Sequence, residues 1–145
     1  MNFKKHEEDI KFKMNSKMNL SRHKEFMRIA LELAVHGNPT PNPYVGCVIV
    51  KEGKIISQGY HKRCGEAHAE VDALDKIKKS DWHRLEVSTF YITLEPCTHY
   101  GRTPPCVDEI INSKPKEVII AVFNFRRLKP TAAFAAFPPI CCSKF

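Results

Sequence analysis

Apolar residues at helical spacing mark the first ordered element of the chain. They recur three and four positions apart after Ser21, a residue type that caps helix N-termini, and Gly37 follows where such a helix would end. Residues 1–20 carry no such period, so we expect a disordered N-terminal extension in which Met14 and Met18 are alternative start residues. The apolar positions of the predicted helix are Phe26, Ile29, Ala30, Leu33 and Ala34.

The next apolar segments are rich in β-branched residues and predict a hairpin. Val45–Val50 and Ile55–Tyr60 are the two strands, and Lys51–Lys54, which contains a glycine, is the turn between them. Cys47 lies within the first strand, where we expect it to pack as a small hydrophobic side chain.

The following segments predict two more helices and two more strands. A helix over Ala67–Lys79 precedes a polar connection at Asp81–Glu86 and a third strand at Ser88–Leu94. Two prolines then open a helix that contains Cys106 and runs to about residue 112. Glu117–Val122 is a continuous apolar run, which is typical of a strand buried on both faces.

Composition narrows the class of protein. The chain has 145 residues, of which 43% are hydrophobic and 27% charged, as expected for one globular domain. No apolar run approaches the roughly 20 residues that a membrane span needs. The first 17 residues have no apolar core, which argues against a secretory signal, and their acidic residues argue against an organelle transit peptide. Six cysteines without such a signal indicate reduced thiols in the cytoplasm.

The net charge of +7 fits either a nucleic acid or a small phosphorylated ligand. No aromatic residues interleave with a dense basic run, so stacking on single-stranded bases is not indicated. We interpret most of the lysines as solvated surface charge.

One histidine, two cysteines and a glutamate carry the chemistry that the sequence indicates. His68 and Glu70 lie at the start of a helix, Cys97 follows a strand, and Cys106 opens another helix. One imidazole and two thiolates can hold a tetrahedral zinc with one open position, and a carboxylate beside it can move protons. The alternatives are a plain polar helix face and a disulfide between the cysteines. However, histidine-x-glutamate followed by proline–cysteine is the signature of zinc deaminases.

Two loops near these residues offer further candidates. Asn42 is held between two prolines, either as a turn residue that satisfies its own backbone or as an amide aimed into a pocket. His61 and Cys64 lie in the loop that leads to His68, and either side chain could reach a metal pocket.

These motifs resemble one branch of the zinc deaminases, the diaminohydroxyphosphoribosylaminopyrimidine deaminases of riboflavin biosynthesis. Members are usually the N-terminal domain of a bifunctional deaminase–reductase, and the resemblance covers about Arg22 to Val122. Its most specific part is the long insert between Cys97 and Cys106, where cytidine, adenosine-in-RNA and guanine deaminases commonly have C-x-x-C. The matching segments are Thr40–Gly46, Gly59–His61, Gly65–Val71 and Thr93–Cys106.

The resemblance implies a fold and a reaction. The fold is a cytidine-deaminase-like α/β domain, a three-layer α/β/α sandwich with a mixed sheet, here expected to lack the last helix and strand. The reaction is the hydrolytic, zinc-dependent deamination of 2,5-diamino-6-(5-phosphoribosylamino)pyrimidin-4-one to the 5-amino-uracil nucleotide and ammonia.

The resemblance also implies roles for individual residues. His68, Cys97 and Cys106 would ligate zinc, and Glu70 would shuttle protons. The residues implied to bind the substrate are Asn42 and His61 on the pyrimidine side, with His99 and Arg102 lining the pocket. Arg102 stands where the family has a basic residue suited to the substrate phosphate.

The chain departs from the family after Val122. We therefore expect a disordered extension at 1–20, a deaminase domain at 21–122 and a divergent tail at 123–145 that packs poorly, with no reductase domain. A shifted reading frame or a truncated gene would explain the tail, and a separate reductase would be needed for the next step.

Two other functions stay open. One is a nucleic-acid base deaminase, favoured by the basic charge and opposed by the long insert between the cysteines. The other is an inactive zinc-binding remnant, which would need a fourth protein ligand from Cys64, His61 or His99. We expect a small phosphoribosyl-pyrimidine as the partner, with neither nucleic acid nor membrane, and leave open a homo-oligomer.

Overall fold

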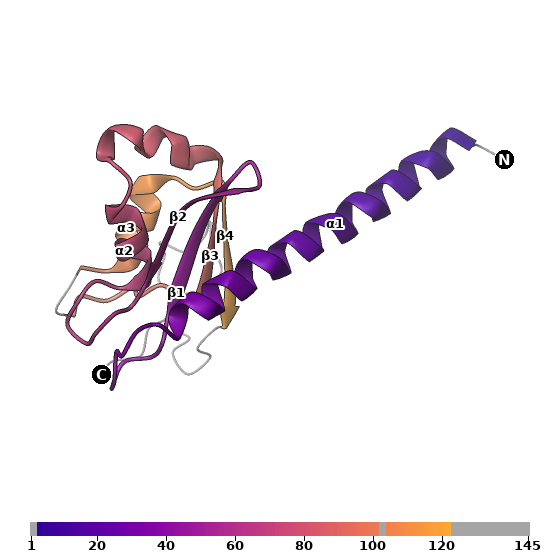
Figure 1. The fold of residues 1–145 in the computed structure, drawn as a ribbon. Coiled ribbons are helices and arrows are strands. Elements are labelled where there is room, and N and C mark those ends of the chain that lie inside the picture. Colours follow the sequence, from indigo (N-terminus) through magenta and orange to yellow (C-terminus); the bar gives the residue numbers. More distant parts are fainter. Residues whose placement is uncertain (1–2, 102–103, 123–145) are drawn as a thin grey trace.

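A computed structural model describes residues 3–101 and 104–122 of the chain. These residues form a four-stranded sheet with helices on both faces (Figure 1). In chain order the elements are α1 (Phe3–Ala34), β1 (Gly46–Lys51), β2 (Lys54–Tyr60), α2 (Ala69–Asp75), the 3-10 helix η1 (Lys79–Val87), β3 (Ser88–Leu94), α3 (Cys106–Ser113) and β4 (Glu117–Val122).

The sheet is mixed, with the strand order β2-β1-β3-β4. β1 pairs antiparallel with both β2 and β3, whereas β3 pairs parallel with β4. The short turn of the β1–β2 hairpin explains the antiparallel pair, and the connection through α3 lets β4 return parallel to β3. The predicted mixed sheet is therefore confirmed.

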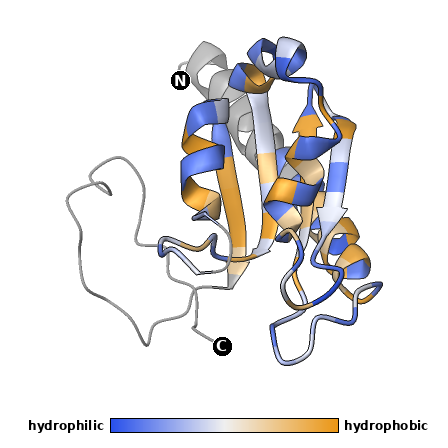
Figure 2. Ribbon diagram, turned by 90° about the vertical axis from the view of Figure 1, so that its left-hand side faces the viewer, coloured by the Kyte–Doolittle hydropathy of each residue, from blue (hydrophilic) through white to orange (hydrophobic). Residues whose placement is uncertain are grey.

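Alternate residues of β1 face two different cores, as the side-chain period of a strand requires. Cys47 and Ile49 belong to the cluster that includes residues of α2 and α3. Val48 and Val50 pack against the cluster that includes Phe26 of α1. This division gives the three predicted layers, and Figure 2 shows hydrophobic stretches on the strands in the middle of the molecule. The burial of Cys47 as a small core side chain is likewise confirmed.

Helix α1 begins earlier than the sequence pattern predicted. We expected a helix from Ser21 after a disordered segment, but the helix is continuous from Phe3. The chain contains neither glycine nor proline before Gly37, so nothing in its sequence interrupts a helix that has started at Phe3. The N-terminal part of α1 projects beyond the sheet in Figure 1, while Phe26 and Ala30 near its other end lie in the core.

The predicted helix over Ala67–Lys79 is shorter in the structure. His68 is the N-cap residue of α2, which ends at Asp75. The segment predicted as a polar connection forms the 3-10 helix η1. In this conformation Leu85 lies fully in the core and Trp82 packs against it. The third and fourth strands have the predicted bounds.

The prediction that β4 is buried on both faces is wrong for the part of the chain that the structure describes. Val118, Ile119 and Ile120 are only half-buried, and Glu117 and Ala121 are exposed. Within the described residues β4 lies at the edge of the sheet, so it has a strand neighbour on one side. The divergent tail, 123–145, and its predicted poor packing lie outside the described residues.

Two glycines allow helices to lie directly on the hairpin. A Cβ at Gly59 in β2 would overlap backbone atoms of Ala69 and Ala73 in α2, and one at Gly46 in β1 would overlap the Ala30 carbonyl in α1. Glycine is required at such close approaches because every other side chain needs that space. The start of α2, and with it the residues of the candidate site, is thereby held close to β2.

None of the described helices has both the length and the apolar character needed to cross a membrane.

Candidate metal centre and active site

Three metal-binding side chains meet where two helices begin and one strand has just ended. His68 is the N-cap of α2, Cys106 is the first residue of α3, and Cys97 lies three residues beyond the end of β3. The donor atoms of the three residues all lie within 4.8 Å of one another. Within the described residues these three form the group that could hold a metal ion.

The donor distances fit a tetrahedral zinc. His68 Nδ1 lies 3.1 Å from Cys106 Sγ and 3.5 Å from Cys97 Sγ. Zinc bonds of about 2.0 Å to nitrogen and 2.3 Å to sulfur at a tetrahedral angle place such atoms about 3.5 Å apart. The backbone N–H of Cys106 donates to Cys97 Sγ at 3.1 Å, which orients this sulfur. Both cysteines are buried thiols, so the alternative of a disulfide between them does not hold.

The three residues considered as a fourth ligand do not join this group in the described structure. Cys64 is exposed, and both ring nitrogens of His61 are engaged by Asn42 and Ala67. His99 is half-buried and also stands apart from the group. Three protein donors are the arrangement of catalytic zinc sites, which keep one position for water or substrate.

Glu70 is a buried carboxylate in the first turn of α2, two residues after His68. Burial raises the pKa of Glu70 to about 7, with the nearby Cys97 adding to the rise, while its backbone hydrogen bond, His68 and Cys106 oppose it. The hydrogen bond to Cys97 raises the pKa of His68. These groups are therefore electrostatically linked, as a metal ligand set and its neighbouring acid–base group would be.

Asn42 and His61, which were both predicted to bind the pyrimidine side of the substrate, lie within hydrogen-bond distance of each other. His61 Nδ1 lies 3.0 Å from the Ala67 carbonyl oxygen, which can only accept, so the proton of the neutral ring is on Nδ1. His61 Nε2 then accepts from the Asn42 amide at 3.0 Å. This hydrogen bond fixes the orientation of the amide and leaves its oxygen as an acceptor for other groups. The His61 ring also meets the His68 ring edge-on, with centroids 5.1 Å apart.

The other predicted substrate residues are described less fully. His99 is half-buried in the segment between the two cysteines. Arg102 lies outside the described residues, so its predicted place in the pocket stays a prediction.

The sequence interpretation missed a polar cluster beside the site. Asp72 of α2 binds Lys62 and Lys76, both at 2.9 Å, and accepts from the Tyr60 backbone N–H at 3.2 Å. The four-residue spacing of Asp72 and Lys76 on a helix is a sequence signal for one of these ion pairs. Nothing in the sequence pattern pointed to the contacts with Tyr60 and Lys62, which depend on how α2 packs on β2.

A family model confirms the resemblance seen in the motifs. The cytidine and deoxycytidylate deaminase zinc-binding region matches residues 20–122, which contain all three candidate ligands. The chain belongs to this deaminase family. The signature residues His68, Glu70, Cys97 and Cys106 thus lie in a region that the family uses to bind zinc.

Among curated deaminase relatives, the riboflavin biosynthesis protein RibD of Aquifex aeolicus is 50% identical over 103 residues, covering 70% of this chain and 28% of that protein. The diaminohydroxyphosphoribosylamino-pyrimidine deaminase of Buchnera aphidicola is 50% identical over 98 residues, covering 66% and 64% respectively. This chain thus spans about a quarter of the length of the RibD relatives that it matches.

Solved structures of deaminases share the fold. RibD of Acinetobacter baumannii superposes with a TM-score of 0.65 at 42% identity, covering 70% of this chain and 28% of that one. The Rib2 deaminase of Aspergillus oryzae, in complex with DARIPP, superposes with a TM-score of 0.52 at 30% identity, covering 64% of each chain. The predicted cytidine-deaminase-like fold is confirmed by these neighbours.

Proposed function

We propose that this chain is a hydrolytic deaminase of riboflavin biosynthesis. Its substrate is 2,5-diamino-6-(5-phosphoribosylamino)pyrimidin-4-one, and its products are the 5-amino-uracil nucleotide and ammonia. The observation that carries the proposal is the meeting of His68, Cys97 and Cys106 beside the buried Glu70. The identity of about 50% to proteins named for riboflavin biosynthesis and for this deamination supports the substrate.

The residues present fit zinc, and we assign His68, Cys97 and Cys106 as its ligands. Bound zinc would supply Lewis-acid activation of water near neutral pH. The cysteines must stay reduced to bind a metal, which supports the cytoplasmic location that the cysteine content predicts.

Glu70 is assigned the proton transfers. Water adds its oxygen to the amino-bearing ring carbon, and its proton passes through Glu70 to the adjacent ring nitrogen. Glu70 then takes the remaining proton from the added hydroxyl and gives it to the amine, so the C–N bond breaks, ammonia leaves and the ring carbon becomes a carbonyl. The burial of Glu70 supports this role, because a carboxylate shielded from bulk water exchanges protons with the substrate rather than with solvent.

Four residues are assigned to substrate binding. The Asn42 amide, oriented by His61, offers hydrogen bonds to the polar edge of the pyrimidine. His99 and Arg102 belong to the insert between the cysteine ligands, and the Arg102 guanidinium suits the phosphate through two parallel hydrogen bonds.

The decisive experiment measures zinc content and ammonia release on the purified full chain, with the phosphoribosyl-pyrimidine and an RNA oligonucleotide as parallel substrates. We expect about one zinc per chain and ammonia from the pyrimidine nucleotide alone. Ammonia from RNA would favour the base-deaminase alternative, for which the net charge of +7 is the supporting observation. Zinc without ammonia from either substrate would indicate an inactive remnant and contradict the proposal.

A further inference from the structure

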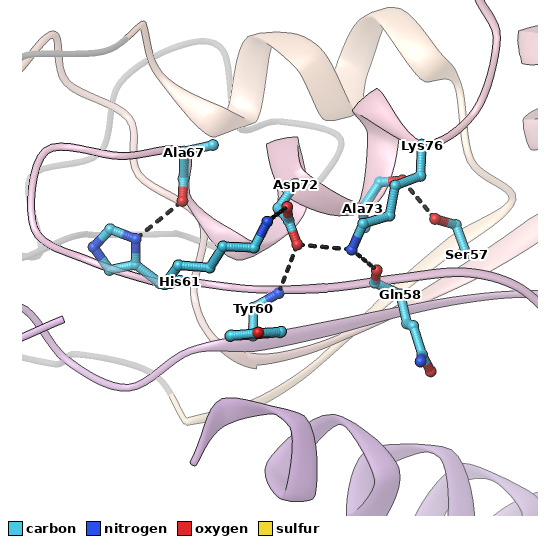
Figure 3. A network of polar contacts seen from close by, with 9 residues as sticks. Ser57, Gln58, Tyr60, His61, Ala67, Asp72, Ala73 and Lys76 are labelled. Atoms are coloured by element: carbon cyan, nitrogen blue, oxygen red, sulfur yellow. Dashed lines mark hydrogen bonds and ion pairs between the residues drawn. The ribbon is translucent and has the colours of Figure 1, made fainter. Parts of the chain in front are cut away.

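A single carboxylate, that of Asp72, is bonded to both residues that flank His61. Its Oδ2 atom accepts from the backbone N–H of Tyr60 at 3.2 Å, and its Oδ1 atom accepts from Lys62 Nζ at 2.9 Å. Tyr60 ends β2 and Lys62 lies in the loop that follows, so Asp72 ties both sides of His61 to helix α2. Figure 3 shows Asp72 next to the Tyr60 backbone, with His61 turned toward Ala67.

The same carboxylate also belongs to a row of contacts that holds α2 on β2. Lys76 Nζ binds Asp72 Oδ2 at 2.9 Å and the Gln58 carbonyl oxygen at 2.7 Å. Ser57 Oγ donates to the Ala73 carbonyl oxygen at 2.6 Å (Figure 3). These contacts join α2 to the strand, whereas the contacts of Asp72 to Tyr60 and Lys62 reach the residues on either side of His61.

The Asp72 carboxylate is built to stay ionised. Burial opposes its charge, but hydrogen bonds from Lys62, Lys76 and the Tyr60 backbone outweigh this and lower the pKa of Asp72 below its ordinary value. The Asp72 side chain is only 10% exposed, while each lysine side chain is 48% exposed. The carboxylate therefore lies inside the fold, and the two lysines reach it from the surface. Charge-assisted hydrogen bonds of this kind orient a group more strongly than neutral ones.

His61 connects the loop that Asp72 holds to Asn42 of the candidate site. Its own backbone N–H donates to the Val45 carbonyl oxygen at 3.0 Å, and the neighbouring Lys62 carbonyl oxygen accepts from the Asn38 backbone N–H at 2.8 Å. The loop that contains Asn42 therefore lies against the loop that Asp72 holds. A rotation of His61 by loss of the Asp72 contacts would weaken its bond to the Asn42 amide, because that bond depends on where Nε2 points.

We propose that Asp72 is a positioning residue, which holds His61 through Tyr60 and Lys62 and thereby orients the Asn42 amide for the pyrimidine ring. The proposal rests on the proposed function for its substrate, but the positioning itself is a property of the folded chain. Asp72 does not belong to the candidate metal group, so its effect should fall on substrate binding rather than on zinc content.

The test compares variants that remove the same kind of contact on either side of Asp72. Asp72→Asn cannot serve three donors, because its amide offers one oxygen and places a donor toward the others. Lys62→Met removes an ion pair on the His61 loop. Lys76→Met, the matched control, removes the ion pair between Asp72 and the end of α2, together with the bond from Lys76 to Gln58 in β2. Far-UV circular dichroism and zinc content verify that each full-length variant is folded and loaded.

We expect Asp72→Asn to raise KM for the phosphoribosyl-pyrimidine by roughly tenfold with little change in kcat, the size of one lost charged hydrogen bond. Lys62→Met should raise KM more than Lys76→Met does. In a His61→Ala background, Asp72→Asn should add little, because the residue through which it acts has been removed. Equal KM effects of the two lysine variants, or full additivity with His61→Ala, would overturn the proposal.

A spectroscopic measurement tests the positioning without using activity. The ¹⁵N signals of the His61 imidazole report which ring nitrogen carries the proton, and in the parent we expect protonated Nδ1 and acceptor Nε2. Asp72→Asn should shift these signals, and Lys76→Met should not. If the parent protein releases no ammonia, the proposed function fails, while unchanged His61 signals in Asp72→Asn would separately overturn the positioning role.

Discussion

Glu70 is a carboxylic acid with little access to solvent, placed beside sulfur and nitrogen donors. Burying an ionised carboxylate costs free energy unless it is paired. Carboxylates that are nevertheless buried are often found at functional sites. Its pKa of about 7 means that, within this site, it both accepts and releases protons near neutral pH. A cation bound at the neighbouring donors would favour its ionised form and so shift the balance toward proton acceptance.

Replacing Glu70 by glutamine should abolish deamination while keeping the metal. The amide has nearly the same shape but cannot take up a proton, and acid–base groups contribute roughly 10²–10⁴-fold to rates. We expect kcat to fall by about that factor, with zinc content and thermal stability close to those of the parent. The measurement is ammonia release alongside metal analysis, and turnover at the parent rate would rule Glu70 out as the proton carrier.

Arg102→Ala should weaken binding of the phosphorylated substrate. The motivation is a single guanidinium in the insert between the two cysteines, which suits a phosphate. Loss of a bidentate contact should raise KM by roughly 10- to 100-fold and leave kcat nearly unchanged. Arg84→Ala, which removes an exposed arginine of η1, is the control and should leave KM unchanged. Equal KM values for the parent and Arg102→Ala would contradict the assignment.

Residue types at fixed spacing were enough to predict the three side chains that the structure brings together as candidate metal donors, because chemistry restricts which side chains can bind zinc. The pairing of Asn42 with His61 was harder to foresee, since each also had an ordinary loop interpretation. The cluster around Asp72 was not predicted at all. Its partners Tyr60 and Lys62 come from a different element, and only the packing of α2 on β2 brings them together.

At the scale of elements, α2 depends on the strand beneath it. It has seven residues, fewer than an isolated helix needs to be stable in water. The close approach at Gly59 and the bonds from Ser57 and Lys76 supply the missing support. Because His68 and Glu70 lie at the start of this helix, their positions depend on how α2 packs on β2.

Gly59→Ala should therefore disturb both stability and metal binding. The added methyl would overlap the backbone of α2, and overpacking of this kind costs about 1–3 kcal/mol of unfolding free energy. Displacement of the helix start should also weaken zinc affinity. Gly53→Ala is the matched control, because Gly53 lies in the hairpin turn with a φ of +75° and should lose about 1 kcal/mol through backbone strain alone.

Chemical denaturation and competition with a zinc chelator give the two readouts. Equal losses of zinc affinity in Gly59→Ala and Gly53→Ala would show that zinc affinity depends on the stability of the hairpin rather than on the packing of α2 on β2.

Element boundaries were the least predictable part of the fold. The strands were identified to within a residue because β-branched runs and turn residues frame them. The start of α1 was missed because a charged segment without an apolar period can still be helical when nothing breaks it. The 3-10 helix η1 was missed because Leu85 and Trp82 lie among polar residues, and their burial follows from tertiary packing.

At the scale of the whole molecule, the candidate ligands connect three separate parts of the fold. They come from the starts of α2 and α3 and from the segment after β3. A metal held by all three would bind the native chain and not the unfolded one, so its binding energy would add to the stability of the domain.

Zinc removal should lower the melting temperature. A zinc concentration of 1,000 times Kd would contribute roughly 4 kcal/mol, which corresponds to a shift of about 10 °C or more in a domain of this size. We expect chelation to lower Tm by that amount in the parent and in Cys64→Ser, which loses an exposed thiol. Cys97→Ser should melt low with or without the chelator. A parent Tm unaffected by chelation in calorimetry would argue against a stabilising metal.

The two ends of the β1–β2 hairpin should differ in how far they can move. The end that contains Gly46 and Gly59 is held by helices, and the turn is not. Gly46 and Gly59 take part in adjacent pairs of the hairpin, Gly46 with Tyr60 and Cys47 with Gly59, at the end nearest the metal donors. Helices press on this end from both faces, whereas the turn at Glu52 and Gly53 is exposed. Insertions or foreign sequence at the turn should be absorbed locally, so the hairpin tip is the place to attach a label or affinity tag without moving the residues of the candidate site.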